Sequence, residues 1–240
     1  MLNNMKYTAI SYLLWALLFT NSIFAQEIEE STNSIYASIV QAKSEYEFAL
    51  ENEASSYYLQ QLSYNVAALN QNYGNYDEAF KYHKKRLDHI LADTTLNYNI
   101  KASAYNNLGS VELVRGNYVE SEYYLNSVNL FHPEIVDSQK NFIILNYSSL
   151  YLAKDLPHKA KEAIDTVYDE MVEQFKNEEL MLTDLRAAKL EIEFVLEPTE
   201  LKLSELENLI RKMISLIGEE TPFAEQNMKR LEELKEQLPD

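Results

Sequence analysis

The chain has 240 residues, of which 46% are hydrophobic, and it contains only 4 Gly and 5 Pro. This composition supplies enough apolar surface for a core but few residues that turns require, so it favours an all-α fold. The formal net charge is −17, since 38 acidic residues outnumber 21 basic ones, and such a charge argues against nucleic acid and anionic lipid as partners. Cysteine is absent, which excludes disulfides, thiolate catalysis and thiolate metal ligands.

The first 25 residues have the layout of a secretory signal peptide. Lys6 provides a positive charge, the stretch from Ala9 to Phe19 is almost entirely apolar, and Ala25 ends the segment before an acidic stretch. The apolar run is short for a membrane span, because a transmembrane helix needs about 20 such residues. We therefore expect residues 1–25 to be removed during export and residues 26–240 to form one domain. An uncleaved membrane anchor and a core helix of the fold are the alternatives.

A helix is expected from Ile35 to Leu50, and an internal repeat follows it. The phrases Gly-Asn-Tyr-Asp-Glu-Ala and Gly-Asn-Tyr-Val-Glu-Ser begin at Gly74 and Gly116, 42 residues apart. A recurrence at this period indicates a stack of small helical units, and such arrays usually serve as binding surfaces. Small residues seven before and five after each glycine would let the two helices of one unit approach closely.

These residues resemble the tetratricopeptide repeat, whose usual period is about 34 residues. The resemblance implies a right-handed superhelical solenoid of antiparallel helix pairs. Because the period here is longer, we expect the extra residues of the second unit to lengthen both of its helices by about one turn. The residues that define the repeats are Gly74, Tyr76, Ala79, Tyr105, Leu108, Gly109, Gly116, Tyr118, Ser121, Leu125, Pro133 and, in a third unit, Ala160.

The rest of the predicted array is less regular. The third unit has Asp155 in place of the turn glycine and Pro157 at the start of its second helix, where a missing amide hydrogen is harmless. The stretches 178–196 and 201–217 are apolar-periodic and predict a fourth hairpin without the signature. A last helix after Thr221 should cap the array, since a solenoid needs a polar end. The prediction is three recognisable repeats, a fourth degenerate hairpin and a C-terminal capping helix.

The first helix of each unit should line the concave side, as in the resembling family. Small residues there leave room for a backbone and apolar ones offer anchors, which suits an extended or helical peptide. The C-terminal helix or a second copy of the chain could instead cover this face. Counted from the turns, the predicted contact residues are Tyr64, Ala68, Gln71, Asn72, Asn106, Ser110, Leu113, Val114, Phe142, Leu145, Ser149, Leu152 and Ala153.

Several other polar residues are interpreted as structural. Asn65, Asn107 and Asn146 occupy equivalent places in three units, where a carboxamide can stitch adjacent helices together or pair with a ligand backbone. The basic cluster 84–86 is interpreted as a solvated face that balances neighbouring carboxylates. The four histidines are scattered, so no metal site is predicted.

The sequence therefore predicts a non-catalytic scaffold or adaptor that binds a protein or peptide in the cell envelope or outside the cell. It contains no nucleotide-binding glycine motif and no hydrolase elbow, and we expect no enzyme activity, cofactor or metal. A membrane-tethered sensory module and an accessory subunit of an envelope enzyme are the alternative functions. Self-association is also open, and the identity of the partner is beyond the sequence.

Overall fold

The computed structural model describes residues 31–218 and 221–238, and every regular element in these ranges is an α-helix. The predicted signal peptide lies outside the described residues. The ten helices of the described part are α1 (Ser31–Glu51), α2 (Ser56–Asn72), α3 (Tyr76–Ala92), α4 (Tyr98–Val114), α5 (Tyr118–Asn126), α6 (Asp137–Ala153), α7 (Pro157–Gln174), α8 (Glu179–Leu196), α9 (Glu200–Ile217) and α10 (Pro222–Lys235).

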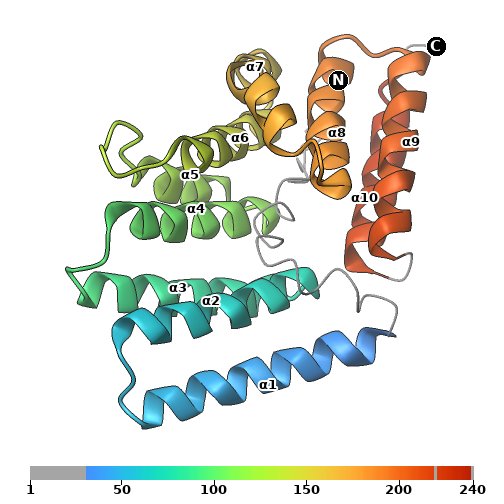
Figure 1. Cartoon of the computed structure of the whole chain (residues 1–240). Coiled ribbons are helices and arrows are strands. Elements are labelled where there is room, and N and C mark those ends of the chain that lie inside the picture. Colours follow the sequence, from blue (N-terminus) through green and yellow to red (C-terminus); the bar gives the residue numbers. More distant parts are fainter. Residues whose placement is uncertain (1–30, 219–220, 239–240) are drawn as a thin grey trace.

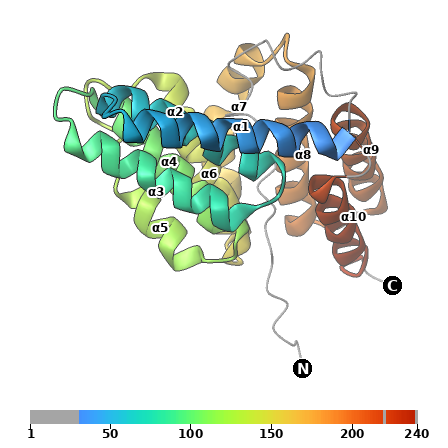
Figure 2. The same cartoon turned by 90° about the horizontal axis from the view of Figure 1, so that it is seen from below.

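The helices pack as successive antiparallel pairs. The pairs are α2 with α3, α4 with α5, α6 with α7, and α8 with α9, and each pair also packs on the next one along the chain (Figure 1). Helix α1 covers the first pair, and α10 lies beside α9 at the other end (Figure 2). This arrangement is an all-α solenoid, which confirms the predicted fold class.

The turn inside each of the first three pairs has the same hydrogen-bond pattern. After α2, the amide of Asn75 donates to the carbonyl of Asn70 at 2.8 Å and that of Gly74 to Gln71 at 3.0 Å. These two bonds form the Schellman motif, which requires a residue with positive φ at the helix end. Gly74 has φ of 80° and Gly116 has φ of 77°, while Asp155 adopts the same region with φ of 59°. The third turn thus keeps the geometry without a glycine, since Asp tolerates this conformation better than most residues.

Gly109 allows α4 and α5 to approach closely. A Cβ atom added there would lie 2.8 Å from the side chain of Leu125 and 3.3 Å from the carbonyl oxygen of Ser121. The Ser121 hydroxyl in turn donates to the Gly109 carbonyl at 2.7 Å. In the third pair the bond runs the other way, since the Ser148 hydroxyl of the first helix donates to the carbonyl of Ala160 in the second helix at 3.1 Å. Small residues at these positions therefore set the distance between the paired helices.

The second helix of the second pair is shorter than the sequence predicted. Helix α5 has 9 residues, whereas α3 has 17, and the residues between Asn126 and α6 form a loop. Pro133 cannot donate a backbone hydrogen bond and disfavours helical geometry in the residue before it, so the helix cannot continue through this stretch. The loop is fixed on the start of α4, where the Tyr98 hydroxyl accepts from the amide of Asn129 at 2.5 Å and the His132 ring stacks on Tyr98 at 3.9 Å. The expectation that both helices of this unit are lengthened is wrong.

The described core has one large apolar cluster and two smaller ones. The large cluster extends from α4 to α10, and the smaller clusters join α1 to α3 and α3 to α4. Beside the two smaller clusters, polar side chains are also buried between α2, α3 and α4, among them Arg86. Its Nε donates to Gln60 Oε1 at 3.2 Å, and its guanidinium lies 4.6 Å from the centre of the Tyr64 ring. The interpretation of residues 84–86 as a solvated face is therefore wrong for Arg86, which packs inward from α3.

Candidate binding surface

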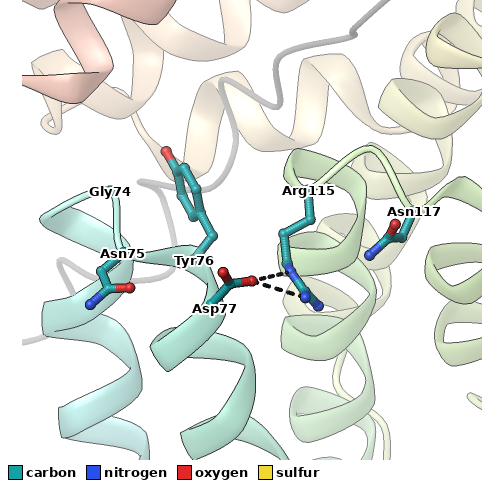
Figure 3. A pocket seen from close by; sticks show the side chains of 6 residues that line it. All are labelled: Gly74, Asn75, Tyr76, Asp77, Arg115 and Asn117. Atoms are coloured by element: carbon teal, nitrogen blue, oxygen red, sulfur yellow. Dashed lines mark hydrogen bonds and ion pairs between the residues drawn. The ribbon is translucent and has the colours of Figure 1, made fainter.

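The two repeated phrases of the sequence line one cavity. It has a volume of about 430 Å³ and lies between the α2–α3 turn and the α4–α5 turn (Figure 3). We name it the turn pocket, and its lining residues are Gly74, Asn75, Tyr76, Asp77, Arg115 and Asn117. Equivalent turns of neighbouring repeats lie side by side in a solenoid, so the same motif supplies both walls.

A charged network holds the Arg115 side of the turn pocket. Arg115 Nη2 lies 2.9 Å from Asp77 Oδ1, and Nη1 lies 2.7 Å from Glu112 Oε1. Glu112 is buried and also accepts from Asn117 Nδ2 at 2.5 Å. The guanidinium further packs over the Phe80 ring, 4.8 Å from its centre. Arg115 is thereby fixed between two repeats, while the Asp77 side chain remains 85% exposed and can accept hydrogen bonds from a partner.

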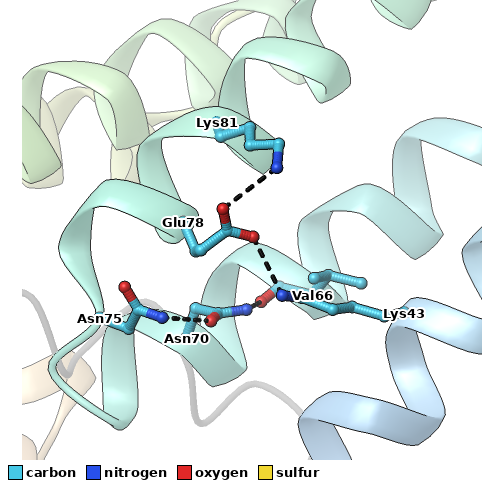
Figure 4. Close-up of polar contacts among 6 residues, drawn as sticks. All are labelled: Lys43, Val66, Asn70, Asn75, Glu78 and Lys81. Atoms are coloured by element: carbon cyan, nitrogen blue, oxygen red, sulfur yellow. Dashed lines mark hydrogen bonds and ion pairs between the residues drawn. The ribbon is translucent and has the colours of Figure 1, made fainter.

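On the Asn75 side of the turn pocket, side-chain hydrogen bonds connect the turn to α2. Asn75 Nδ2 donates to Asn70 Oδ1 at 3.3 Å, and Asn70 Nδ2 donates to the carbonyl of Val66 at 2.8 Å (Figure 4). One turn further into α3, Glu78 accepts from Lys43 of α1 at 2.9 Å, and this hydrogen bond lowers the pKa of the Glu78 carboxyl. The turn is therefore connected to α1, and its residues are held in place before any partner arrives.

Tyr76 connects the turn pocket to the C-terminal helix. Its ring extends away from Asp77 at the edge of the pocket (Figure 3), and its hydroxyl donates to Gln226 Oε1 of α10 at 3.4 Å. Burial raises the pKa of this phenol, so the hydroxyl stays protonated and remains a donor at neutral pH. The turn pocket and α10 are therefore adjacent parts of one surface.

Helix α10 packs on α9 and forms a buried ion pair with α8. Arg230 Nε lies 2.7 Å from Glu191 Oε1, and both side chains are almost completely buried. Burial raises the pKa of Tyr118, the first residue of α5, and the nearby Arg230 opposes that shift. The apolar residues of α10 belong to the large core cluster, which also contains Leu113, Leu145 and Leu152. The helix thus joins α8 to the beginnings of α3 and α5.

Most residues predicted to line the concave side are enclosed in the fold. The buried ones are Ala68, Asn106, Ser110, Leu113, Leu145, Ser149, Leu152 and Ala153. Tyr64, Gln71, Asn72, Val114 and Phe142 keep part of their surface. Side chains without exposed surface cannot contact a partner in this conformation, so we do not include the buried set in the candidate site.

Two of the partly exposed residues have partners inside the chain. The Tyr64 ring lies under the Arg86 guanidinium, and Gln71 Oε1 lies 3.3 Å from His83 Nε2. Burial, with a further contribution from Arg86, lowers the pKa of His83 to about 3. His83 is therefore neutral at physiological pH and acts as a packed polar group of the α2–α3 seam.

The three recurring asparagines do not share one role. Asn146 Nδ2 donates to Asn106 Oδ1 at 2.8 Å, which connects α6 to α4. Asn107 is buried, and turning its carboxamide would place the oxygen 2.9 Å from Arg86 Nη1. Asn65 is exposed. Asn146 therefore connects two helices through its amide. The three amides have different surroundings, although they occupy equivalent positions in the sequence.

The residues of the turn pocket that carry charge were not in the predicted contact set. Gly74 and Tyr76 were predicted to define the repeats, and no contact role was predicted for Asp77, Arg115 or Asn117. The available signal was the repeated phrase itself, because residues that follow equivalent turns must meet on the same edge of the stack. The positions predicted by offset along the first helix of each unit are mostly buried in the core instead.

The fold and this surface define a helical-repeat protein. Within the described residues, no three or more His, Asp or Glu side chains come together in a way that could hold a metal ion. None of the described helices is both long and apolar enough to span a membrane. No protein-family model, curated protein or solved structure shows a significant match to this chain.

Proposed function

We propose that this protein is an exported, non-catalytic scaffold that binds a segment of another protein at the turn pocket. The observation that carries this proposal is that two successive repeats present the same turn motif to one polar cavity. Charged and carboxamide side chains, Asp77, Arg115, Asn75 and Asn117, border that cavity. Such groups complement the donors and acceptors of a peptide backbone and of polar side chains.

The resemblance to tetratricopeptide proteins supports the same function. The turn glycines, the small residues of the helix seams and the stack of antiparallel pairs are those expected from that family, in which helical arrays bind other proteins. The pocket is also pre-organised, since Arg115 and Asn75 already have partners within the chain. Pre-organised groups lose little conformational entropy when a partner binds, which favours affinity.

The turn pocket can be tested with a matched pair of charge reversals. Asp77→Lys reverses an exposed carboxylate in the pocket, and Asp137→Lys reverses an equally accessible one at the start of α6. Both residues lie in a first helical turn and pair with a cation, so their effects on folding should be similar. We expect affinity capture from the native source to lose the partner with Asp77→Lys and to retain it with Asp137→Lys. Equal capture by both variants would reject the turn pocket as the binding site.

Export is tested on the native protein. The N-terminal segment predicts that mass spectrometry will find the chain beginning near residue 26, in a soluble fraction of the envelope or in the medium. Retention of Met1 together with recovery in the membrane fraction would instead support the membrane-tethered alternative.

A further inference from the structure

The loop between α5 and α6 presents one aromatic side chain to solvent. Phe131 is 96% exposed, more than any other large hydrophobic side chain of the described residues. Other apolar residues of this loop behave differently, because Val128 and Ile135 are buried in the large core cluster. The loop thus packs on the fold while it leaves its largest apolar group in water, where burial against another molecule would be favourable.

Hydrogen bonds hold this loop in one conformation. The amide of Phe131 donates to Asn129 Oδ1 at 3.0 Å, and the amide of Asn129 donates to the Tyr98 hydroxyl of α4. On the other side of Phe131, Glu134 Oε2 accepts from the amide of Tyr98 at 2.5 Å, and the His132 ring stacks on Tyr98. The backbone is therefore fixed on both sides of the exposed ring. Little conformational entropy would be lost when a partner contacts it, which favours affinity.

Phe131 shares one edge of the solenoid with further exposed apolar residues. The connections α1–α2, α3–α4 and α5–α6 lie at the same edge, opposite the edge that carries the turn pocket (Figure 1). We name this surface the loop edge, and it consists of residues 45–58, 88–101 and 127–140. Apolar groups gathered on one part of a surface are typical of sites of protein contact. The exposed apolar residues of the loop edge include Phe48, Leu50, Tyr57, Leu91, Phe131 and Val136.

The loop edge is also acidic. The first of its three stretches contains four acidic residues and no Lys or Arg, and each of the other two contains two acidic residues and one Lys. Glu51 and Glu53 are exposed and form no ion pair within the described part of the chain. A contact surface with an excess of one charge favours a partner with the opposite charge. The loop edge therefore fits a partner surface that is basic.

Neither the N-terminal segment nor a second copy of the chain fits the loop edge. Removal of residues 1–25, which the proposed export requires, leaves residues 26–30 before α1, and these span at most about 18 Å. Helix α1 begins at the opposite edge and is about 30 Å long, so this segment cannot reach Phe131 (Figure 1). Two copies that met at this edge would bring like charges together, which is unfavourable. A different protein satisfies both constraints.

We propose that the loop edge is a second docking surface, which binds a different protein whose contact area is basic and contains an apolar pocket for Phe131. The acidic residues orient that partner, and the Phe131 ring supplies the central apolar contact. Because the turn pocket lies on the opposite edge, both surfaces can be occupied at once, and the chain then connects two proteins. This inference goes beyond the proposed function and relies on it only for the removal of residues 1–25.

Thermal unfolding tests whether Phe131 serves the fold itself. Phe131→Ser should leave the melting temperature within about 2 °C of the wild type, because the ring is almost fully exposed. Phe175→Ser removes a buried ring of the large core cluster and is the contrasting variant, which should melt at a much lower temperature or fail to fold. A large decrease for Phe131→Ser would overturn the inference, since the ring would then belong to the core.

Photo-crosslinking tests what contacts the loop edge. The probe is the chain of residues 26–240 with photoreactive benzoylphenylalanine in place of Phe131, irradiated in an extract of the native source. We expect an adduct with a different protein, whereas an adduct with a second copy, or no adduct, would overturn the inference. The same probe carrying Asp77→Lys should form as much adduct. Loss of the adduct in that variant would mean that both edges contact one partner, and the second docking surface would be rejected.

Binding of the purified adduct partner tests the chemistry of the contact. Phe131→Ser should weaken binding about 30-fold, as expected for truncation of a central anchor, and Leu201→Ser at an exposed residue of α9 should leave it unchanged. Glu51→Lys with Glu53→Lys, and separately a rise in NaCl from about 0.05 to 0.5 M, should each weaken binding about tenfold. Equal affinity of the Phe131 variant and the wild type would reject the apolar anchor, and binding that is independent of salt would reject the basic partner surface.

The two docking surfaces can fail separately. If the loop edge gives no adduct while Asp77→Lys still loses its captured partner, only the inference about the loop edge is wrong. If the adduct forms and depends on Phe131 while Asp77→Lys retains every captured protein, the turn pocket is wrong and the loop edge remains.

Discussion

The first pair of helices and the last two pairs are stabilised in different ways. Where α2, α3 and α4 meet, Gln60, His83 and Arg86 are buried; Arg86 donates a hydrogen bond to Gln60, and His83 contacts Gln71. In α7, α8 and α9, the corresponding interior is filled by residues such as Ile164 and Phe194. Hydrogen bonds between helices form only when the helices are aligned in one register. Apolar contacts mainly require side chains of the right total volume to fill the space between the helices. The same repeat architecture can therefore be held either by polar matching or by apolar packing.

The buried guanidinium of Arg86 is stabilised by hydrogen bonds and an aromatic ring. No described carboxylate forms an ion pair with Arg86, and burial lowers the pKa of its guanidinium to about 10, so it still carries its charge at neutral pH. Gln60 and the Ser103 hydroxyl accept its hydrogen bonds, and the Tyr64 ring packs on its face. Arg suits this setting better than Lys because its planar, delocalised cation is weakly hydrated and stacks on aromatic rings.

The largest expected effect lies in the apolar half. Phe194→Ala removes a fully buried aromatic side chain from the large cluster, so we expect the free energy of unfolding to fall by about 3–5 kcal/mol. Urea unfolding followed by circular dichroism measures it. Leu201→Ala, at an exposed residue of α9, is the control and should change the free energy by less than about 0.5 kcal/mol. A small effect for Phe194 would contradict stabilisation by apolar packing.

Gly109→Leu tests the seam between α4 and α5, where polar and apolar regions meet. The new side chain would collide with Leu125 and with the backbone of Ser121, so overpacking should lower stability by roughly 1–3 kcal/mol. Thermal unfolding reports the change. A melting temperature equal to that of the wild-type chain would show that the helices separate without loss and that the close approach is not required.

Arg86→Met tests the polar seam directly. The substitution removes the cation but leaves Gln60 with an unsatisfied buried oxygen, and we expect a loss of about 1–3 kcal/mol. Lys84→Met, two residues away on the same helix, is a control that removes a cation lying over the Tyr124 ring, with an expected loss of about 0.5–1 kcal/mol. Equal stability of the Arg86 variant and the wild type would mean that the polar contacts specify register without adding stability.

The smallest effect near neutral pH is expected from His83, whose contribution appears as a pH dependence that grows as the pH falls. The pKa of His83 is about 3 in the folded chain, against 6.5 for an unperturbed His, so the unfolded state binds a proton first as the pH falls. The contribution of His83 to stability is therefore complete above pH 6.5 and declines between pH 6.5 and 3, by at most about 1.4 kcal/mol per pH unit. His83→Gln should flatten the stability profile in this window relative to the wild type. An unchanged slope would exclude His83 as its source.

The order and pairing of the helices were determined by the sequence alone. Hydrophobic periodicity gave the fourth hairpin, which matches α8 and α9 to within one residue at each end. The turn residues are also local properties, because a Schellman turn needs only positive φ and its own hydrogen bonds, so Gly74, Gly116 and Asp155 could be placed without knowledge of the rest of the fold.

Only the tertiary structure decided what each face of the helices meets. The sequence could not show that Arg86 turns inward, that α5 ends early against Tyr98, or that Asp77 and Arg115 meet across two repeats. These outcomes depend on contacts between residues distant in the chain, whereas periodicity describes one helix at a time. The position of α10 has the same cause, since Arg230 and its partner Glu191 on α8 are 39 residues apart in the chain.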